Sequence, residues 1–214
     1  MTKDNKEISK ATLNRLPSYL KYLYQLDKLN VATVSSTTIA NGLNLNPVQV
    51  RKDIALVSSV AGKPKMGYVT KEIIADLESF LGYNNTHDAV LVGVGGLGKA
   101  FLGYGGFENY GLNIVAAFDN SERVVNTKIN GKPVYDVSKL KEIVERFNIQ
   151  IGIITVPSYA AQEVADRMVG AGIKAIWNFA SVHLNIPSNV ALKNEDLASS
   201  LALLSLQIQQ NRND

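Results

Sequence analysis

The chain of 214 residues contains no cysteine, and this absence removes several classes of function at once. Disulfide frameworks, cysteine-ligated zinc sites, thiol redox switches and cysteine nucleophiles all need that side chain. Histidine is scarce as well, because only His87 and His183 are present. A protein of this composition that responds to redox state has to do so through a bound molecule.

The sequence also lacks a long hydrophobic run. Its first ten residues are polar and of mixed charge, so they do not resemble a signal peptide. The longest apolar stretches, such as residues 90–94 and 149–157, have the length of β-strands, whereas a membrane-spanning helix needs about 20 residues. With 46% hydrophobic and 19% charged residues, the composition is that of a globular protein. We therefore expect a cytoplasmic protein that does not enter a membrane.

Charge is distributed unevenly, although the formal net charge of +3 hides it. Residues 1–71 contain 11 Lys and Arg but only 4 Asp and Glu, which gives +7, and the rest of the chain carries −4. A basic front segment joined to a mildly acidic body predicts a polyanionic partner for the front segment only. Chance clustering of charge is the alternative interpretation.

The front segment has the pattern of a helix-turn-helix. Leucines at three- and four-residue spacing predict a helix over residues 8–29, which Pro17 either begins or kinks. Ser35-Ser36 is a good N-cap for a short second helix, and Asn46-Pro47 favours the start of a third. Apolar residues stand where two such helices pack: Ile39, Ala40, Leu43, Leu45 and Val50.

A basic segment rich in glycine and proline, residues 62–68, follows the third helix and predicts a β-hairpin. A helix-turn-helix followed by such a hairpin is the pattern of a winged-helix DNA-binding domain. On the third helix, Gln49, Arg51 and Lys52 suit base edges and phosphates in the major groove. Lys63 and Lys65 on the hairpin suit phosphates or the minor groove. A solvated helix face is the alternative.

The pattern changes after a helix predicted over 72–81 and a linker over 83–87. Strands that alternate with helices predict right-handed crossovers and a parallel sheet. The expected strands are 89–92, 112–118, 149–156 and 174–179. Three helices are expected: one that begins at residue 99, one over 140–147 and one over 160–171. A last helix over 196–209 carries a heptad-like apolar stripe that either pairs with another chain or packs on its own domain: Leu197, Leu201, Leu204 and Ile208.

A glycine-rich turn follows the first of these strands. Gly93, Gly95 and Gly98 form G-x-G-x-x-G before a helix, and Asp119 ends the next strand 21 residues later. Such a turn lets a pyrophosphate approach the helix N-terminus, and the acidic residue accepts hydrogen bonds from the adenosine ribose. The pattern predicts a site that prefers NAD(H) to NADP(H), a preference that Arg123 tempers. A glycine-rich turn that binds nothing is the alternative.

The groups that a dehydrogenase needs are missing from the usual places. Such an enzyme needs a proton donor and a substrate anchor beside the nicotinamide. His87 falls in the predicted linker and His183 in a late loop, and no nucleophile motif or metal constellation is present. We therefore expect no enzymatic activity. Two alternatives stay open: a small NAD-dependent oxidoreductase with a helical appendage, and a module that binds another adenine nucleotide such as coenzyme A.

Over nearly its full length, the chain resembles the Rex family of redox-sensing transcriptional repressors. The resemblance rests on a specific combination of segments rather than on the glycine-rich turn alone. These segments are 12–20 (TLNRLPSYL), 46–53 (NPVQVRKD), 93–100 (GVGGLGKA) running into 104–107 (YGGF), and 176–180 (IWNFA).

The resemblance implies an α/β fold in three parts. A winged helix-turn-helix domain would cover residues 1–82, a Rossmann-like parallel-sheet domain that binds NAD(H) would cover 83–192, and a C-terminal dimerisation helix over 193–214 would be swapped onto the partner in a homodimer. The dimer would bind palindromic double-stranded operator DNA. It would be released when NADH binds, with NAD⁺ competing, and so report the NADH/NAD⁺ ratio.

Residue roles follow by position. The cofactor site would comprise Gly93, Val94, Gly95, Gly96, Leu97, Gly98, Asp119, Tyr104 and Phe107, the last two in an apolar pocket that favours the neutral reduced nicotinamide. The DNA contacts would be Arg15, Gln49, Arg51, Lys52, Lys63 and Lys65. The switch would be Lys21, Tyr104 and Asp196 of the partner subunit. Lys21 stands where relatives often have Arg, which keeps the charge but loses bidentate geometry. Residues 55–60 also lack the usual aromatic and glycine residues, and the hairpin is one residue longer.

Overall fold

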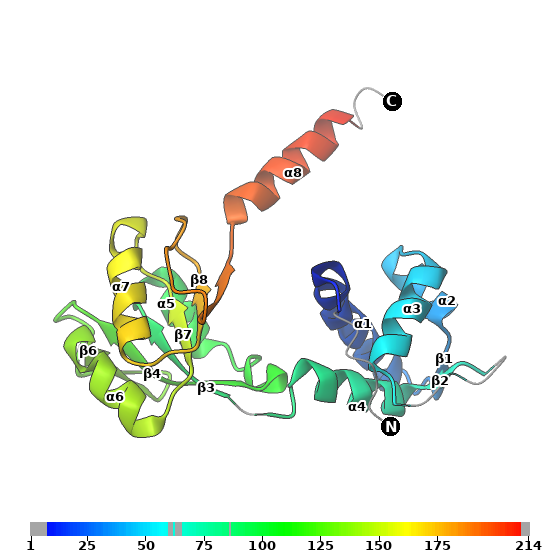
Figure 1. Cartoon of the computed structure of the whole chain (residues 1–214), viewed down its shortest axis with the longest axis horizontal. Coiled ribbons are helices and arrows are strands. Elements are labelled where there is room, and N and C mark those ends of the chain that lie inside the picture. Colours follow the sequence, from blue (N-terminus) through cyan, green and yellow to red (C-terminus); the bar gives the residue numbers. More distant parts are fainter. Residues whose placement is uncertain (1–7, 60–61, 63–65, 86, 211–214) are drawn as a thin grey trace. The chain divides into compact units, whose positions relative to one another are not determined.

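A computed structural model describes residues 8–59, 62, 66–85 and 87–210 (Figure 1). The chain forms two compact units, which divide between residues 85 and 86. The sequence predicted that the linker reaches His87, but His87 begins strand β3 (His87–Val92), and its backbone N–H donates to the Gly111 carbonyl at 2.8 Å. Because His87 already pairs in the sheet, the linker is shorter than predicted.

The first unit is helical with a small sheet. Its elements are α1 (Lys10–Lys28), β1 (Thr33–Val34), α2 (Ser36–Leu43), α3 (Pro47–Val57), β2 (Tyr68–Val69) and α4 (Thr70–Leu81). One apolar core joins the four helices, and its members include Leu16, Leu20, Leu23, Ile39, Ala40, Val50, Ile54, Ile73 and Leu77. The packing of α2 against α3 through Ile39, Ala40 and Val50 agrees with the predicted helix-turn-helix.

The helix ends follow local chemistry. Ser35 caps α2 by accepting the Thr38 N–H, and Asn46 caps α3 with Pro47 in its first turn, as the sequence predicted. Pro17, in contrast, lies inside α1, so the expectation that it begins that helix is wrong. Pro17 is exposed, and water can reach the carbonyl that its missing N–H leaves without a helical partner.

The two-stranded sheet pairs β1 with β2 in antiparallel orientation, with Thr33 opposite Val69. The predicted hairpin therefore contributes only its second arm to the described sheet, because the partner strand precedes α2. Gly67 turns the chain with a φ of +76°, and a Cβ there would collide with the Val34 carbonyl oxygen. Lys63 and Lys65 lie outside the described residues.

The second unit is built on a seven-stranded sheet in the order β5-β6-β4-β3-β7-β8-β9. All neighbouring strands are parallel except β5 and β6. Its strands are β3, β4 (Leu112–Asp119), β5 (Lys128–Ile129), β6 (Lys132–Asp136), β7 (Ile151–Ile154), β8 (Ala175–Asn178) and β9 (Ala191–Asn194). Its helices are α5 (Gly96–Gly103), η1 (Glu108–Tyr110), η2 (Val137–Lys139), α6 (Leu140–Phe147), α7 (Ser158–Gly170) and α8 (Leu197–Gln210).

This strand order is that of a Rossmann-like, doubly wound domain. Alternate residues of β3 enter different cores: Val90 and Val92 pack with α6 and α7, whereas Ala89 and Leu91 pack with α5. The chain reverses its direction of progress across the sheet between β3 and β7. The carboxyl ends of these strands form the crevice where this architecture binds ligands.

Three strands of the seven-stranded sheet were not predicted. The five residues of β6 contain Lys132 and Pro133 and bury only Val134, while β5 is two residues long and β9 is largely exposed. None of them forms the continuous apolar run that marks a strand buried on both faces. Pairing in the sheet, and not local pattern, makes these segments extended.

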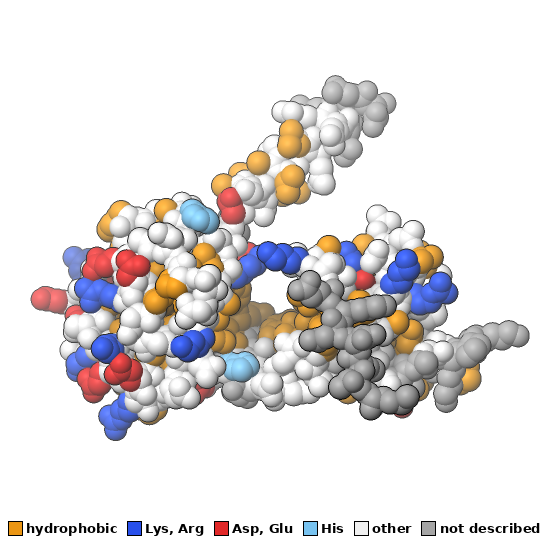
Figure 2. All heavy atoms as spheres, viewed as in Figure 1, with side chains coloured by type: hydrophobic (Ala, Val, Ile, Leu, Met, Phe, Trp, Pro, Cys, Tyr) orange, Lys and Arg blue, Asp and Glu red, His pale blue; other side chains and the backbone are white. Residues whose placement is uncertain are grey.

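The C-terminal helix α8 does not pack on its own domain. Every residue from 198 to 210 is exposed, including Leu201, Leu204 and Ile208 of the predicted stripe. Figure 2 displays hydrophobic side chains along this helix. The alternative in which the stripe packs on its own domain is therefore wrong.

Among the residues that the structure describes, no helix combines the length and the apolar character needed to cross a bilayer.

Candidate functional site

The three motif glycines have three different environments. Gly93 adopts a φ of +103°, which favours glycine, at the turn that leaves β3. A Cβ on Gly98 would collide with the Gly93 carbonyl oxygen and lie 3.1 Å from Thr155 Oγ1, so helix and strand pack closely there. A Cβ on Gly95 would meet no described atom within 4 Å. Gly95 therefore faces open space at the point where a pyrophosphate has to approach the backbone.

Asp119 holds this loop in place. Its Oδ2 accepts the Val94 N–H at 2.6 Å, and its Oδ1 accepts the Ser121 N–H at 2.8 Å. A carboxylate has about four lone-pair positions, so each oxygen can still accept another hydrogen bond. The residue at the carboxyl end of β4 thus braces the turn and keeps the capacity to accept hydroxyl groups of a ligand.

A pocket of about 320 Å³ brings the predicted Gly93, Gly95 and Asp119 together. Its other lining residues come from the carboxyl ends of β3, β4 and β7, from η2 and from α7: Val92, Asn120, Val137, Thr155, Val156, Pro157, Tyr159, Ala160, Glu163, Val164 and Arg167. The first turn of α5, which includes Gly96 and Leu97, has no side-chain cap, so its N–H groups can take an anionic ligand.

Sequence reasoning did not identify Thr155 as part of the site. Its hydroxyl donates to the Gly93 carbonyl at 2.7 Å and locks the turn against β7. The sequence feature that could have identified it is a hydroxyl residue directly after β7, the strand that pairs with β3.

Tyr104 and Phe107 line a separate pocket of about 390 Å³, together with Ala100, Phe101, Trp177 and Phe179. We call this group the aromatic pocket. Its rings pack edge to face: the Tyr104 and Phe107 centroids are 4.9 Å apart, and those of Phe101 and Phe179 are 4.7 Å apart. The two pockets share no lining residue. The structure therefore joins Tyr104 to Phe107 but not to the glycine loop.

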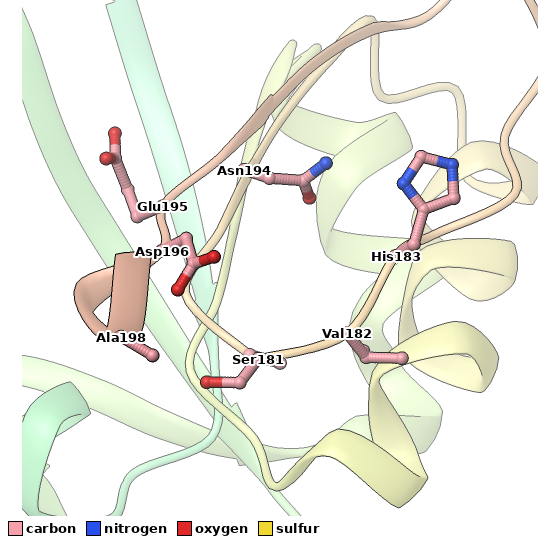
Figure 3. Close-up of a pocket in the computed structure, with 8 residues that line it drawn as sticks. Ser181, Val182, His183, Asn194, Glu195, Asp196 and Ala198 are labelled. Atoms are coloured by element: carbon pink, nitrogen blue, oxygen red, sulfur yellow. The ribbon is translucent and has the colours of Figure 1, made fainter. Parts of the chain in front are cut away.

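A third pocket, of about 440 Å³, lies where β8 and β9 end (Figure 3). Ser181 and His183 enter it from the loop after β8, and Asn194 and Asp196 point toward that loop from the segment before α8. The buried Asn178 ties the two sides together, because its amide nitrogen donates to the Val182 carbonyl at 3.1 Å and to Asn194 Oδ1 at 2.9 Å.

Asp196 caps its own helix. Its Oδ1 accepts the Ser199 N–H at 3.0 Å, and its Oδ2 accepts the Ser199 hydroxyl. These two bonds, the hydroxyl's first, lower the pKa of the Asp196 carboxyl below its ordinary value. A carboxylate that begins α8 is ionised at neutral pH and exposed.

In the first unit, Gln49, Arg51 and Lys52 are exposed on α3. Figure 2 displays basic side chains over this helix. Arg15 is held differently from the other predicted DNA contacts, because its Nε donates to Asp53 Oδ2 at 2.8 Å and its Nη2 to Asp53 Oδ1 at 3.0 Å. A quarter of the Arg15 side chain remains exposed.

Asp53 is a second residue, after Thr155, that sequence reasoning did not single out. It is 1% exposed and also accepts hydrogen bonds from the Tyr19 hydroxyl at 2.7 Å, Gln49 Nε2 at 2.9 Å and the Thr12 hydroxyl at 3.2 Å. Burial alone would raise the pKa of Asp53, but the bonds from Arg15, Tyr19 and Gln49 outweigh it and lower that pKa. The sequence feature that could have identified Asp53 is an acidic residue that directly follows Arg51 and Lys52 in a helix with no other acidic residue.

The remaining predicted residues are dispersed. Lys21 is exposed on α1 in the first unit, whereas Tyr104 and Asp196 belong to the second unit. Within the described part of the chain, no group of three or more His, Asp or Glu residues could hold a metal ion.

Comparison with known families assigns both units. A model described as "CoA binding domain" matches residues 84–182, and one described as "Putative DNA-binding protein N-terminus" matches residues 7–55.

Curated relatives carry the name redox-sensing transcriptional repressor Rex. The protein of Treponema denticola is 42% identical over 92% of this chain and 93% of its own length. That of Carboxydothermus hydrogenoformans is 42% identical over 96% of this chain and 98% of its own length.

Among solved structures, RSP in complex with β-NAD⁺ and operator DNA matches with a TM-score of 0.90 at 35% identity, covering 97% of this chain and 95% of the other. RSP in complex with β-NADH matches with a TM-score of 0.88 at 34% identity, covering 97% of each chain. RSP is described as a Rex-family repressor. This chain belongs to the Rex family of redox-sensing transcriptional repressors.

Proposed function

We propose that this chain is a repressor that binds palindromic operator DNA as a homodimer and leaves it when NADH binds. The observation that carries the proposal is the loop at the end of β3. Gly95 opens onto a pocket, and Asp119 ties the loop to β4 while keeping lone pairs for a ligand. Solved relatives contain NAD⁺ with operator DNA in one case and NADH in another.

The residues present fit a dinucleotide. The N–H groups of the first turn of α5 would hold the pyrophosphate, and Asp119 would accept hydrogen bonds from the adenosine ribose hydroxyls. Gly93 and Gly98 keep the turn tight enough for this approach. The negative charge of Asp119 would repel a 2′-phosphate, which favours NAD(H) over NADP(H). The bound nicotinamide supplies the difference in charge between NAD⁺ and NADH that the protein reads.

The DNA contacts belong to the first unit. Arg51 and Lys52 on α3 would enter the major groove with Gln49, and Lys63 and Lys65 would extend the contact from the wing. Arg15 would contact a phosphate through the exposed part of its guanidinium, with its orientation fixed by Asp53.

The switch requires the second subunit. The exposed α8 would be swapped onto the partner and bury its apolar stripe there. Tyr104, which is 55% exposed, would then meet Asp196 of the partner subunit, and Lys21 would complete the bridge. NADH can shift the dimer only by binding the DNA-incompetent arrangement more tightly than the competent one.

The protein would bind the dinucleotide without turnover. The alternative ligand is coenzyme A, which the description of the matching family model favours over other adenine nucleotides. Isothermal titration calorimetry with NADH, NAD⁺, NADPH and coenzyme A separates these ligands, and NADH should bind most tightly. Incubating NADH with candidate substrates tests for the oxidoreductase alternative.

The test of the proposal is DNA binding measured by fluorescence anisotropy while NADH is added. The probe is a labelled duplex obtained by in vitro selection from a random library with the full-length chain. We expect NADH to release the duplex and NAD⁺ to oppose that release. If no duplex is bound, or if NADH leaves binding unchanged, the proposal fails.

Two variants separate the units in that assay. Asp119→Ala should weaken NADH binding while the duplex is still bound, because it changes only the second unit. Asp88→Ala is the matched control, since Asp88 lies near the amino end of β3 opposite Asn113, from which it accepts a bond, whereas Asp119 lies at the carboxyl end of β4. Loss of DNA binding in Asp119→Ala would contradict the division of roles.

A further inference from the structure

Gln49 is one of the three α3 side chains expected to meet DNA, and its amide is not free to turn. Its Nε2 donates to Asp53 Oδ1 at 2.9 Å, one helical turn further along α3. The side chain is otherwise exposed, and none of the described residues donates to its Oε1. The amide nitrogen therefore faces the protein and the amide oxygen faces solvent.

The charge state of Asp53 makes this orientation compulsory. Hydrogen bonds from Arg15, Tyr19 and Gln49 keep the carboxyl ionised, and an ionised carboxylate can only accept hydrogen bonds. Turning the Gln49 amide over would set its Oε1 against Asp53 Oδ1, two acceptors with no proton between them. Asp53 cannot adapt, because four side chains bind it and it is 1% exposed.

We propose that Asp53 is a positioning residue that sets base specificity by fixing the Gln49 amide with its carbonyl oxygen toward the DNA. This inference rests on the proposed DNA-binding function. A freely rotating glutamine can present either end to a base edge, whereas Gln49 always presents an acceptor in the outward position.

The acceptor selects among the base edges of the major groove. Adenine N6 and cytosine N4 are amino donors, whereas guanine offers O6 and N7 and thymine offers O4, which are all acceptors. Gln49 Oε1 therefore requires an adenine or a cytosine at the base that it reaches. A guanine or thymine at that position would set its own acceptor oxygen or nitrogen against Gln49 Oε1, so we expect these two bases to be disfavoured.

Base analogues test the requirement directly. In the selected duplex, each adenine is replaced in turn by purine and each cytosine by 2-pyrimidinone, symmetrically in both half-sites, which removes only the amino group. We expect one position at which the full-length protein loses about 10-fold in affinity. In Gln49→Ala, removing the amino group at that position should change affinity less than about 2-fold. If Gln49→Ala remains as sensitive as the wild type at every position, Gln49 does not read an amino donor.

The role of Asp53 is tested by Asp53→Asn, whose amide can donate to Gln49 Oε1 and so allows the Gln49 side chain to turn over. We expect the sensitivity at the Gln49 position to fall to about 2-fold or less, and a guanine there to become tolerated. Arg15→Gln is the matched control, because it also breaks the Arg15–Asp53 pair but leaves a carboxylate facing Gln49. It should weaken binding to all duplexes uniformly and keep the discrimination. Equal loss of discrimination in both variants would assign the effect to packing and overturn the proposal.

The double variant, with Asp53→Asn added to Gln49→Ala, completes a double-mutant cycle for this pair. The second substitution should not alter discrimination further, because the side chain that Asp53 orients is gone. An additional loss of discrimination would show that Asp53 acts elsewhere. Failure of this inference is distinct from failure of the proposed function: here the selected duplex is bound and released by NADH, and only the position-specific pattern differs.

Discussion

The Trp177 indole Nε1 donates a hydrogen bond to Glu195 Oε1 at 2.9 Å. Trp177 belongs to the aromatic pocket, and Glu195 lies in the segment between β9 and α8, so this bond joins the pocket to the beginning of the exposed helix. Trp177 is the only tryptophan of the chain, which makes its fluorescence a specific reporter of this junction.

We predict that Glu195→Ala shifts the Trp177 emission and destabilises the second unit by about 1 kcal/mol, because the partly buried indole N–H loses its acceptor. Urea unfolding followed by tryptophan fluorescence measures both effects. Lys193→Ala is the control, since the 3.9 Å ion pair between Lys193 and Glu195 is largely exposed and contributes little. Equal effects of the two variants would mean that the indole bond is not the stabilising contact.

Gly95 and Gly98 should separate cofactor binding from folding. In Gly95→Ala, the new methyl group meets no described atom within 4 Å. We therefore expect the free energy of unfolding to stay within about 0.5 kcal/mol of the wild-type value, whereas NADH affinity should fall strongly. In Gly98→Ala, the methyl group collides with the Gly93 carbonyl, and we expect a loss of about 1–3 kcal/mol in stability. Calorimetric NADH titration and thermal unfolding of each variant check this. Full NADH affinity in Gly95→Ala would contradict the placement of the pyrophosphate.

Asp53 should make the stability of the first unit depend on pH at the acidic end. Its folded-state pKa is lowered from 3.8, so unfolding takes up a proton in the acidic range, and the stabilisation is present above 3.8 and is lost as the pH falls below 3.8 through the lower folded-state pKa. Asp53→Asn lacks this pH-dependent stabilisation because its amide does not titrate. We expect backbone amides of α1 and α3 to exchange faster in Asp53→Asn than in wild type at pH 6, with a smaller difference once the pH is brought below about 3. Hydrogen–deuterium exchange mass spectrometry measures these rates. A difference between the two proteins that grows as the pH is lowered would contradict the claim that the ionised Asp53 carboxylate stabilises the first unit.

Helix α8 should hold the dimer together. Leu204 is 57% exposed, so Leu204→Asp leaves the folded chain intact and removes apolar area from the contact with the partner. We expect sedimentation velocity to find wild type dimeric and Leu204→Asp monomeric. Gln209→Asp is the matched control, because it adds the same charge about 140° around the helix from Leu204. A dimer that survives Leu204→Asp would place the interface elsewhere.

Much of the fold could be predicted from the sequence because its strongest signals are local. Asn46 and Pro47 mark the start of α3, and the spacing from Gly93 to Asp119 marks a strand, a turn and a second strand in sequence. Strands β5, β6 and β9 could not be predicted, since sheet partners rather than apolar runs extend them.

The site was predictable where one segment carries it and unpredictable where distant segments meet. The glycine loop is a single segment, whereas the Arg15–Asp53 pair joins residues 38 positions apart and the Thr155–Gly93 bond joins residues 62 positions apart. Tyr104 and the glycine loop lie at opposite ends of α5 and line different pockets. Sequence reasoning did not identify Asp53 and Thr155, whose hydrogen bonds hold predicted site residues in place.

The most direct test of the central claim is the affinity for NADH, measured by calorimetry with and without a saturating amount of the selected duplex. Linkage requires that NADH and DNA weaken each other by the same factor, which is typically about 5- to 150-fold. We predict that the duplex lowers NADH affinity by the factor by which NADH lowers duplex affinity, and that the corresponding factor for NAD⁺ is much smaller. An NADH affinity that is the same with and without the duplex would contradict the claim that NADH releases the repressor from DNA.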